Sequence, residues 1–371
     1  MTLTAISVSR LLSIFRVSPS RSALALLCAV AAVANLEMLG EAASLVYEQL
    51  ASPGKRLFVG YLFSAALLAG WVYLRSGEKA SFLSFLFPRA VWLSDSAKVD
   101  YQLVVFNSFV KVALVAQFLI YGLHIAFGVE EFFRSHLGTW SGTLSPTETV
   151  LAYTLALTIV GDLSVYILHR MMHRIPALWA VHRVHHSATS LTPVTQLRIH
   201  PLELILNNIR SIVVFGTLTG LFGFLSSGAV SKLSFVGVNV FAFAFFSFGA
   251  NLRHSHIRLG YWRWAEHLFI SPLQHQVHHS ANPAHHDRNF GSKLAIWDWL
   301  GGTLVTSRGL GELQFGLDEG STSPETQTLR AALLAPFCGD VAEPSTKLEE
   351  ELVTVHPQLE EEVGRNAGAF S

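Results

Sequence analysis

Cysteine is scarce in this sequence, and so are charged side chains. Only two cysteines, Cys28 and Cys338, occur among 371 residues, and they lie far apart. Two distant cysteines make neither a disulfide framework nor a thiolate metal site, so any metal must be bound through nitrogen and oxygen. Charged residues make up 14% of the chain, against about 25% in a typical soluble domain. The formal net charge is zero, which gives no support for a nucleic-acid partner.

Apolar residues, in contrast, are abundant and form long runs. Hydrophobic residues make up 51% of the chain, and the mean hydropathy is +0.41. A helix needs about 20 apolar residues to cross a bilayer, and six runs approach that length: 22–46, 56–74, 102–128, 149–168, 204–226 and 231–250. The first run also fits a signal peptide, because arginines precede it and it contains a small-residue stretch. These runs predict an all-α, multi-spanning transmembrane helix bundle.

Basic residues between the runs predict the orientation of this bundle. Arginines precede the first run, and Arg75, Lys79, Arg89 and Lys98 lie between the second and the third. By the positive-inside rule, both termini then lie in the cytoplasm. The runs at 204–226 and 231–250 are predicted to form a helical hairpin that crosses the membrane and returns. The segments 169–203 and 251–290 would therefore form a cap on the same, cytoplasmic side.

Histidine is strongly concentrated in that predicted cap. Of 17 histidines, 14 fall between His169 and His286. They include an HxxxH box at 169–173 and two HxxHH boxes, at 182–186 and 275–279. Residues three or four apart share a helix face, so each box can direct imidazoles toward one ion. Interfacial histidines would explain the first box alone, but not three boxes on one side of a membrane.

The number of imidazoles predicts more than one metal ion. Eight box histidines exceed the roughly four to six ligands of a single ion, so the boxes predict a two-metal site. An all-imidazole site suits iron, zinc, copper or nickel. Two closed, structural zinc sites would also use eight imidazoles.

The ordered boxes resemble the fatty acid hydroxylase/sterol desaturase superfamily of membrane di-iron oxidoreductases. The resemblance covers about residues 85 to 306 and rests on the stretches HRMMH, AVHRVHHS, RIHPLE, HSHI, QHQVHHS, NFG and WDWLGGT. It implies that the iron ligands are His169, His173, His182, His185, His186, His275, His278 and His279, with His254 as a ninth and His200 as a less certain tenth. The chain is then expected to have N-terminal membrane segments (1–80) and a catalytic domain (81–308). The Glu-rich composition and weak apolar periodicity after residue 308 predict a polar, acidic C-terminal tail (309–371) that is disordered.

Two carboxylates lie near the histidine boxes in the sequence, and two motifs differ from the family's usual form. Asp162 lies seven residues before His169, on the same helix face and inside an apolar run. It is expected to accept a hydrogen bond from a ligand imidazole, or to make a polar contact between spans. Glu203 has the same two interpretations. The chain has NFG at 289–291 where the family often has NYG, and WDWLGGT where WDRLFGT is common; neither is expected to touch a ligand.

The resemblance implies a membrane-bound di-iron oxygenase. It would use two Fe ions and O2 to hydroxylate or desaturate a bilayer lipid, such as a sterol, a fatty acyl chain or an alkylglycerol ether. The sequence shows no haem or flavin motif, so electrons are expected from a separate small cytochrome or ferredoxin with its reductase. Two alternatives remain: a histidine-rich metal transporter, and a zinc-stabilised membrane scaffold without oxidase activity.

Overall fold

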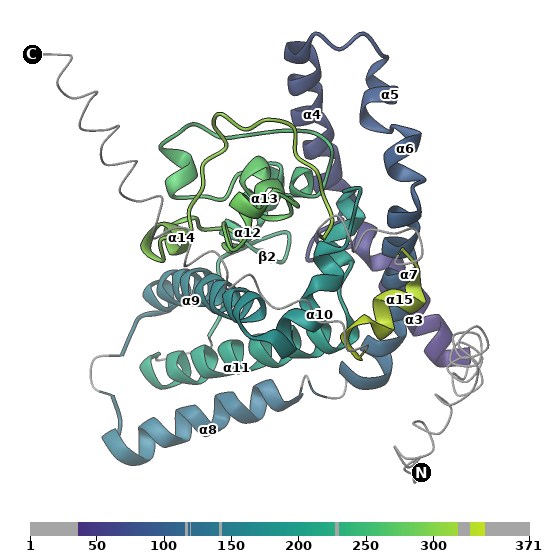
Figure 1. Ribbon diagram of the computed structural model, residues 1–371. Coiled ribbons are helices and arrows are strands. Elements are labelled where there is room, and N and C mark those ends of the chain that lie inside the picture. Colours follow the sequence, from purple (N-terminus) through teal and green to yellow (C-terminus); the bar gives the residue numbers. More distant parts are fainter. Residues whose placement is uncertain are drawn as a thin grey trace, which may run out of the picture.

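The computed structural model describes residues 36–115, 118, 120–140, 143–226, 230–317 and 327–337, and this part of the chain is mostly helical (Figure 1). The N-terminal half contains α3 (Leu36–Ala51), α4 (Val59–Ser76), α5 (Phe82–Leu86), α6 (Arg89–Trp92), α7 (Asp95–Val110), the π-helix η1 (Lys111–Val115) and α8 (Ile120–Leu137). The centre contains α9 (Pro146–Arg174), α10 (Pro176–His186), the 3-10 helix η3 (Pro193–Leu197) and α11 (Pro201–Leu225). There follow β1 (Ser234–Phe235), β2 (Val238–Asn239), α12 (Val240–Ser247), η4 (Ala250–Arg253), η5 (Ala265–His267), α13 (Pro272–His278), η6 (Pro283–His285), α14 (Ile296–Leu300), α15 (Leu329–Leu334) and η8 (Ala335–Phe337).

The longest helices, α9 and α11, lie side by side and run in opposite directions (Figure 1). A capping box formed by Ser145 and Glu148 begins α9, which at 29 residues is about 44 Å long. The start of α9 meets the end of α11, where the backbone N–H of Leu144 donates to the carbonyl of Leu225 at 2.8 Å. Both helices are long and apolar enough to cross a membrane.

Helix α8 packs along α11 at two glycines. A Cβ atom on Gly216 would lie 2.7 Å from the carbonyl oxygen of Gly122, and one on Gly220 would meet the carbonyl of Ala126 even more closely. The two glycines are four residues apart, the spacing that lets apolar helices approach backbone to backbone. This pair of small residues therefore fixes how closely α8 and α11 pack.

Two of the six predicted spans are not single helices. In the run at 102–128, α7 passes into the π-helix η1 and α8 begins at Ile120, while residues 116, 117 and 119 lie outside the described part of the chain. The run at 231–250 forms a two-stranded hairpin followed by α12, whose eight residues extend only about 12 Å, far less than the roughly 30 Å of a bilayer core. The run at 56–74 does form one helix, α4, whereas the first run lies partly outside the described residues.

The chain nevertheless returns along α9 from the end of α11 to the histidine boxes. The backbone N–H of Leu233 donates to Thr154 Oγ1 at 2.7 Å, and the side chain of Asn239 lies 3.2 Å from Thr158 Oγ1. Further along, the backbone N–H of Lys293 donates to Asp162 at 3.1 Å. These contacts move step by step toward the C-terminal end of α9. The segment after α11 therefore runs alongside α9, and it does so as a hairpin and a short helix instead of one long membrane-spanning helix.

Part of the predicted C-terminal tail packs on the helical body. Ala332 is buried in an apolar cluster with Val99, Leu103 and Val184, and α15 contacts α7. Residues 327–337, within the segment expected to be a disordered tail, thus contact the helical body, because Leu329 and Leu333 supply an apolar face.

Candidate metal centre

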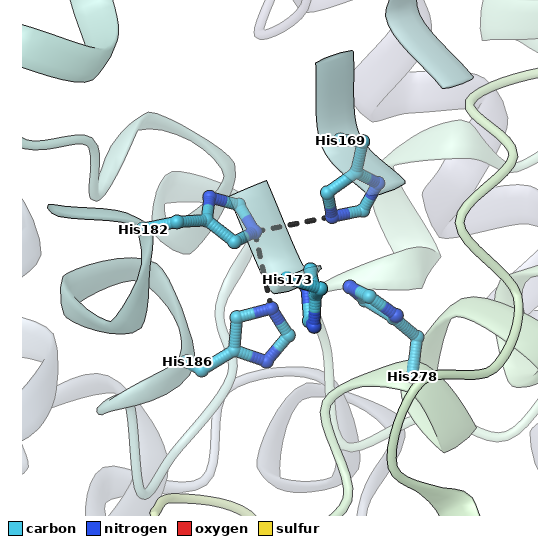
Figure 2. Close-up of side chains that lie close together, drawn as sticks. All are labelled: His169, His173, His182, His186 and His278. Atoms are coloured by element: carbon cyan, nitrogen blue, oxygen red, sulfur yellow. Dashed lines mark hydrogen bonds between the residues drawn. The ribbon is translucent and has the colours of Figure 1, made fainter. Parts of the chain in front are cut away.

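Nine of the ten predicted ligand histidines converge in two adjacent groups. The first group contains His169, His173, His182, His186 and His278, and the second contains His185, His254, His275 and His279. In each group the candidate ligand nitrogens all lie within 4.8 Å of one another. Figure 2 shows the five rings of the first group turned toward a common centre, with dashed lines joining His182 to His169 and His186.

Helix geometry divides each HxxHH box between the two groups. In α10, His182 and His186 are four residues apart and enter the first group, while His185 points into the second. Around α13 the division is reversed, because His275 and His279 enter the second group and His278 enters the first. Adjacent histidines thus face different centres, as a two-ion site requires.

Backbone carbonyls hold the outer nitrogen of several rings. The Nδ1 atoms of His169 and His278 lie 2.7 Å from the carbonyl oxygens of Phe290 and Arg288, and Nδ1 of His185 lies 3.2 Å from that of Arg198. A carbonyl oxygen only accepts, so Nδ1 carries the proton in these three rings. Their Nε2 lone pairs are then free to point into the groups, the tautomer that metal ligands adopt.

The inner nitrogens lie at distances suited to a shared cation. His182 Nε2 is 3.1 Å from His169 Nε2 and 3.2 Å from His186 Nε2. His254 Nε2 is 3.1 Å from the Nε2 atoms of both His275 and His279. Two nitrogens bound about 2.1 Å from one ion lie roughly 3.0–3.4 Å apart at right-angled to tetrahedral geometry.

Buried nitrogens without partners support the same interpretation. Nε2 of His173 and of His278 is buried and has no hydrogen-bond partner among the described residues. An unpaired buried polar atom is costly. Lone pairs that converge on one point also repel one another unless a positive charge lies between them. The donor set therefore fits metal ions.

Burial keeps these imidazoles in the neutral form that binds metals. Desolvation lowers the pKa of His278 to about 3, although its bond to the Arg288 carbonyl opposes the shift. Burial and then the neighbouring His185 lower the pKa of His279 well below its usual value. At neutral pH these two rings are uncharged and available as ligands.

Glu203 lies against a ring of the first group, whereas Asp162 does not. Oε1 of the buried Glu203 is 3.0 Å from Nδ1 of His182. Asp162 instead accepts four hydrogen bonds from the segment 293–297, from the backbone N–H groups of Lys293 and Leu294, Lys293 Nζ and the Trp297 indole. The expectation that Asp162 accepts from a ligand imidazole is wrong: it anchors the chain that follows the Phe290 carbonyl.

His200, the less certain tenth candidate, lies outside both groups. It is the N-cap of α11, where its Nδ1 accepts the backbone N–H of Leu202 at 3.1 Å. Its Nε2 lies 3.3 Å from the carbonyl of Leu333, to which it donates. The Nδ1 lone pair accepts a backbone hydrogen bond and Nε2 carries the proton, so His200 has no free lone pair for a metal ion.

The NFG stretch does touch the candidate ligands, contrary to the sequence-based expectation. Besides accepting from His169, Phe290 packs its ring against His173 at a centroid distance of 5.0 Å. Asp298, from the WDWLGGT stretch, accepts from the backbone N–H groups of Phe290 at 2.8 Å and Gly291 at 2.7 Å. A Cβ on Gly291 would lie 2.7 Å from Asp298 Oδ2, so only glycine allows this turn.

Two further supporting groups were missed by the sequence reasoning. Arg198 is fully buried, donates to Asp100 at 3.0 Å and to the carbonyl of Val184 at 2.8 Å, and presents its own carbonyl to His185. Asp287 Oδ1 lies 3.5 Å from His173 Nδ1. Arg198 could have been singled out by its charge within the RIHPLE stretch. Asp287 could not, because its side chain reaches His173 only through a left-handed backbone conformation at Asp287 (φ 56°).

A cavity of about 340 Å³ adjoins both histidine groups, within the range of roughly 300–1,000 Å³ typical of small-molecule sites. His169 and His182 from the first group line it, as do His185, His254 and His275 from the second. Apolar side chains of α9 and α12, including Leu168 and Phe245, form part of the wall. A hydrocarbon placed there lies beside the inner faces of both groups.

Known proteins with similar sequences carry lipid hydroxylase names. Residues 154–303 match the fatty acid hydroxylase family model. The chain is 26% identical over 229 residues to ornithine lipid hydroxylase OlsE of Rhizobium tropici, covering 60% of this chain and 61% of that protein. It is 28% identical over 166 residues to alkylglycerol monooxygenase of Danio rerio, covering 42% of this chain and 31% of the relative.

The human alkylglycerol monooxygenase is 28% identical over 154 residues, which are 38% of this chain and 28% of the relative. The chain thus matches less than two thirds of the length of each of these relatives. No solved structure matches the chain. The matched residues 154–303 contain all nine converging histidines, so it is the histidine-bearing part of the chain that is similar to the fatty acid hydroxylase family.

Proposed function

We propose that the chain is a membrane-bound di-iron oxygenase that hydroxylates a lipid with dioxygen and electrons from a separate donor protein. The observation that carries this proposal is the pair of histidine groups, five and four imidazoles, beside a cavity whose wall is partly apolar. The names of the relatives, a lipid hydroxylase and alkylglycerol monooxygenases, support the same chemistry.

The size of the first group favours iron over structural zinc. A structural zinc ion takes four ligands in a closed tetrahedron, whereas the first group offers five imidazoles. Iron accepts five or six ligands and leaves positions for other molecules. When bound, two iron ions would supply the activation of dioxygen and the oxidation of an unactivated C–H bond.

The protein's own residues orient the ligands and exclude water. Three backbone carbonyls fix the tautomers of the His169, His278 and His185 rings. The Glu203 carboxylate beside His182 makes that imidazole a stronger metal ligand. Phe290, 0% exposed, covers the side of the first group near His173. These contacts keep the centre rigid and poor in water, which limits side reactions.

We place the histidine groups at the cytoplasmic end of two membrane-crossing helices. α9 and α11 have the length and apolar composition to cross a bilayer. His169 and His173 lie in the last turns of α9, and His200 caps the start of the antiparallel α11, so the candidate centre lies at one end of the pair. A lipid can then reach the cavity from the bilayer, and a soluble electron donor can approach from the cytoplasm.

Metal and product analysis test the proposal directly. The protein, purified into lipid nanodiscs, is expected to contain two iron ions per chain and to consume oxygen when reduced chemically. Lipid extracts analysed by mass spectrometry should gain one oxygen atom. Loss of two hydrogens would indicate desaturation instead, whereas two zinc ions without oxygen uptake would favour the scaffold alternative.

A matched pair of variants tests the ligand assignment. His278→Ala is expected to abolish turnover and lower the metal content. His124→Ala serves as the control, because His124 is exposed and its ring lies 3.0 Å from a carbonyl of its own helix. Full activity of the His278 variant would contradict the assignment.

A further inference from the structure

The cavity beside the histidines is lined by an excess of positive charge. Five cationic side chains contribute to its wall: Lys55, Arg56, Lys111, Arg210 and Arg253. They come from four separate elements, namely the loop between α3 and α4, η1, α11 and the end of η4. Among the described residues, Glu203 is the only carboxylate that lines the cavity, and it already faces His182. The wall therefore carries a net positive charge that the chemistry of the histidine groups does not require.

Most of these cations lack a neutralising partner. Lys55 lies 3.6 Å from Glu48, but the side chains of Arg56 and Lys111 form no ion pair or hydrogen bond with any residue in the described ranges. Asp162 acts on Arg56 at longer range, yet it is occupied by four donors from residues 293–297. Burial lowers the pKa of Lys111, and repulsion by Lys55 and Arg56 lowers it further.

Arg253 and Arg210 each have a buried Nε–H group without a hydrogen-bond partner among the described residues. Arg253 is only 7% exposed; one Nη donates to the carbonyl of Ile270 at 3.2 Å, while its Nε has no partner in the part of the chain that the structure describes. Arg210, inside α11, donates to Ser164 at 2.8 Å, and its Nε is likewise unpaired there. Ionisable groups within a membrane helix normally face a cavity or a partner. Leaving donors of a buried cation unpaired is costly, so these side chains are arranged for an acceptor that enters the cavity.

The rest of the wall is apolar and extends to the histidines. Val165 and Leu168 from α9, Ile199 before α11, and Phe245 and Phe246 from α12 line the same cavity. The Arg253 guanidinium lies 4.5 Å from the centre of the Phe245 ring, where the two kinds of wall meet. A ligand that satisfies both parts has an anionic head and a hydrocarbon body.

We propose that the substrate is an amphiphile with an anionic head, a carboxylate or a phosphate, held by Arg56, Lys111, Arg210 and Arg253 with its hydrocarbon beside the two histidine groups. Calling the ligand a substrate rests on the proposed oxygenase function, but its binding does not. Because the cations and five of the histidines line one cavity, the position of the head determines which carbon lies next to the histidines.

Binding of three probes with the same hydrocarbon tail tests the proposal. The metal-loaded full chain, in nanodiscs of zwitterionic phosphatidylcholine, is titrated with hexadecyl phosphate, hexadecanol or hexadecyltrimethylammonium, and bound probe is measured by native mass spectrometry. The phosphate is expected to bind at least about tenfold more tightly than the alcohol, since a charged hydrogen bond is worth roughly that factor or more. The ammonium probe should not bind.

Variants identify the residues and control for folding. Arg56→Gln and Lys111→Gln should each weaken the phosphate probe about tenfold and leave the alcohol unchanged, and Lys111→Arg should restore most of the affinity. Lys79→Gln is the matched control, because Lys79 is exposed and does not line the cavity. Equal affinity for phosphate and alcohol, or equal loss of both probes in the variants, would overturn the proposal.

Three further outcomes are informative, and the last two separate this inference from the proposed function. Competition by inorganic phosphate alone, at concentrations similar to the probe, would overturn the amphiphile in favour of a free anion. Selective binding of hexadecyl phosphate without oxygen uptake supports the anionic site while contradicting the oxygenase. Turnover of neutral lipids with no preference among heads contradicts the anionic site while supporting the oxygenase.

Discussion

The contact between Glu203 and His182 gives a quantitative prediction about metal affinity. Oε1 of Glu203 lies 3.0 Å from Nδ1 of His182, and both side chains are buried. The same ring presents Nε2 to His169 and His186 at 3.1 and 3.2 Å. Glu203 therefore sets the orientation of a ring that is central to the first histidine group.

The substitution Glu203→Gln keeps the shape of this side chain and removes its charge. Removing the carboxylate beside a ligand imidazole typically lowers metal affinity by about 10- to 100-fold. We therefore expect the affinity for the ion at the first group to fall roughly tenfold, and up to about 100-fold in Glu203→Ala. The second group, which does not contain His182, should keep its ion.

Competition with a chelator measures this effect. The variants are dialysed against graded chelator concentrations, and iron per chain is determined by elemental mass spectrometry; the variant curve should show one ion lost early. Glu148→Gln is the control, because Glu148 is exposed in the capping box at the opposite end of α9. Unchanged retention of both ions in Glu203→Gln and Glu203→Ala would refute the role of this carboxylate.

Three other predictions concern stability. His200→Ala should keep the full metal content and lower stability by about 1 kcal/mol through loss of the α11 cap; a loss of metal, measured alongside thermal unfolding, would show that His200 is a ligand after all. Asp162→Asn should destabilise the protein by about 1–3 kcal/mol and speed hydrogen exchange at residues 290–297, since one of the two acceptor oxygens becomes an NH2 group that cannot accept from the donors bonded there; unchanged exchange would contradict this. The metal-free protein should lose stability as pH falls below about 6.5, by roughly 1.4 kcal/mol per pH unit for each histidine such as His278, because the unfolded chain then binds protons that the folded one does not. Chemical denaturation between pH 7 and 5 checks the sign, and constant stability over that range would refute it.

The convergence of nine histidines was predictable because helix periodicity acts locally. Spacings of three and four residues place imidazoles on one helix face, and neighbouring histidines fan apart. The structure shows this division in both HxxHH boxes. The helical character of the chain and the long helices α9 and α11 were predictable from composition and run length in the same way.

The apolar runs alone did not determine how the chain returns from the end of α11. A run such as 231–250 satisfies the composition of a span, but its backbone forms a hairpin and a short helix that bond to α9. Hydropathy describes the transfer of side chains from water to an apolar phase. It says nothing about which groups form hydrogen bonds with the backbone. That choice depends on Thr154 and Thr158, about 80 residues earlier in the chain.

By itself, the sequence determined a mostly helical chain with long apolar runs, and histidine boxes that resemble those of the fatty acid hydroxylase/sterol desaturase superfamily. Only the tertiary structure decided which groups surround the imidazoles: the Phe290 and Arg288 carbonyls, Glu203 at His182, and His200 as a helix cap. Only the tertiary structure brought Arg56, Lys111, Arg210 and Arg253 to one cavity wall. The physical reason is that ligand spacing is a property of one helix turn, whereas hydrogen-bond partners and the balance of buried charge depend on residues far apart in sequence.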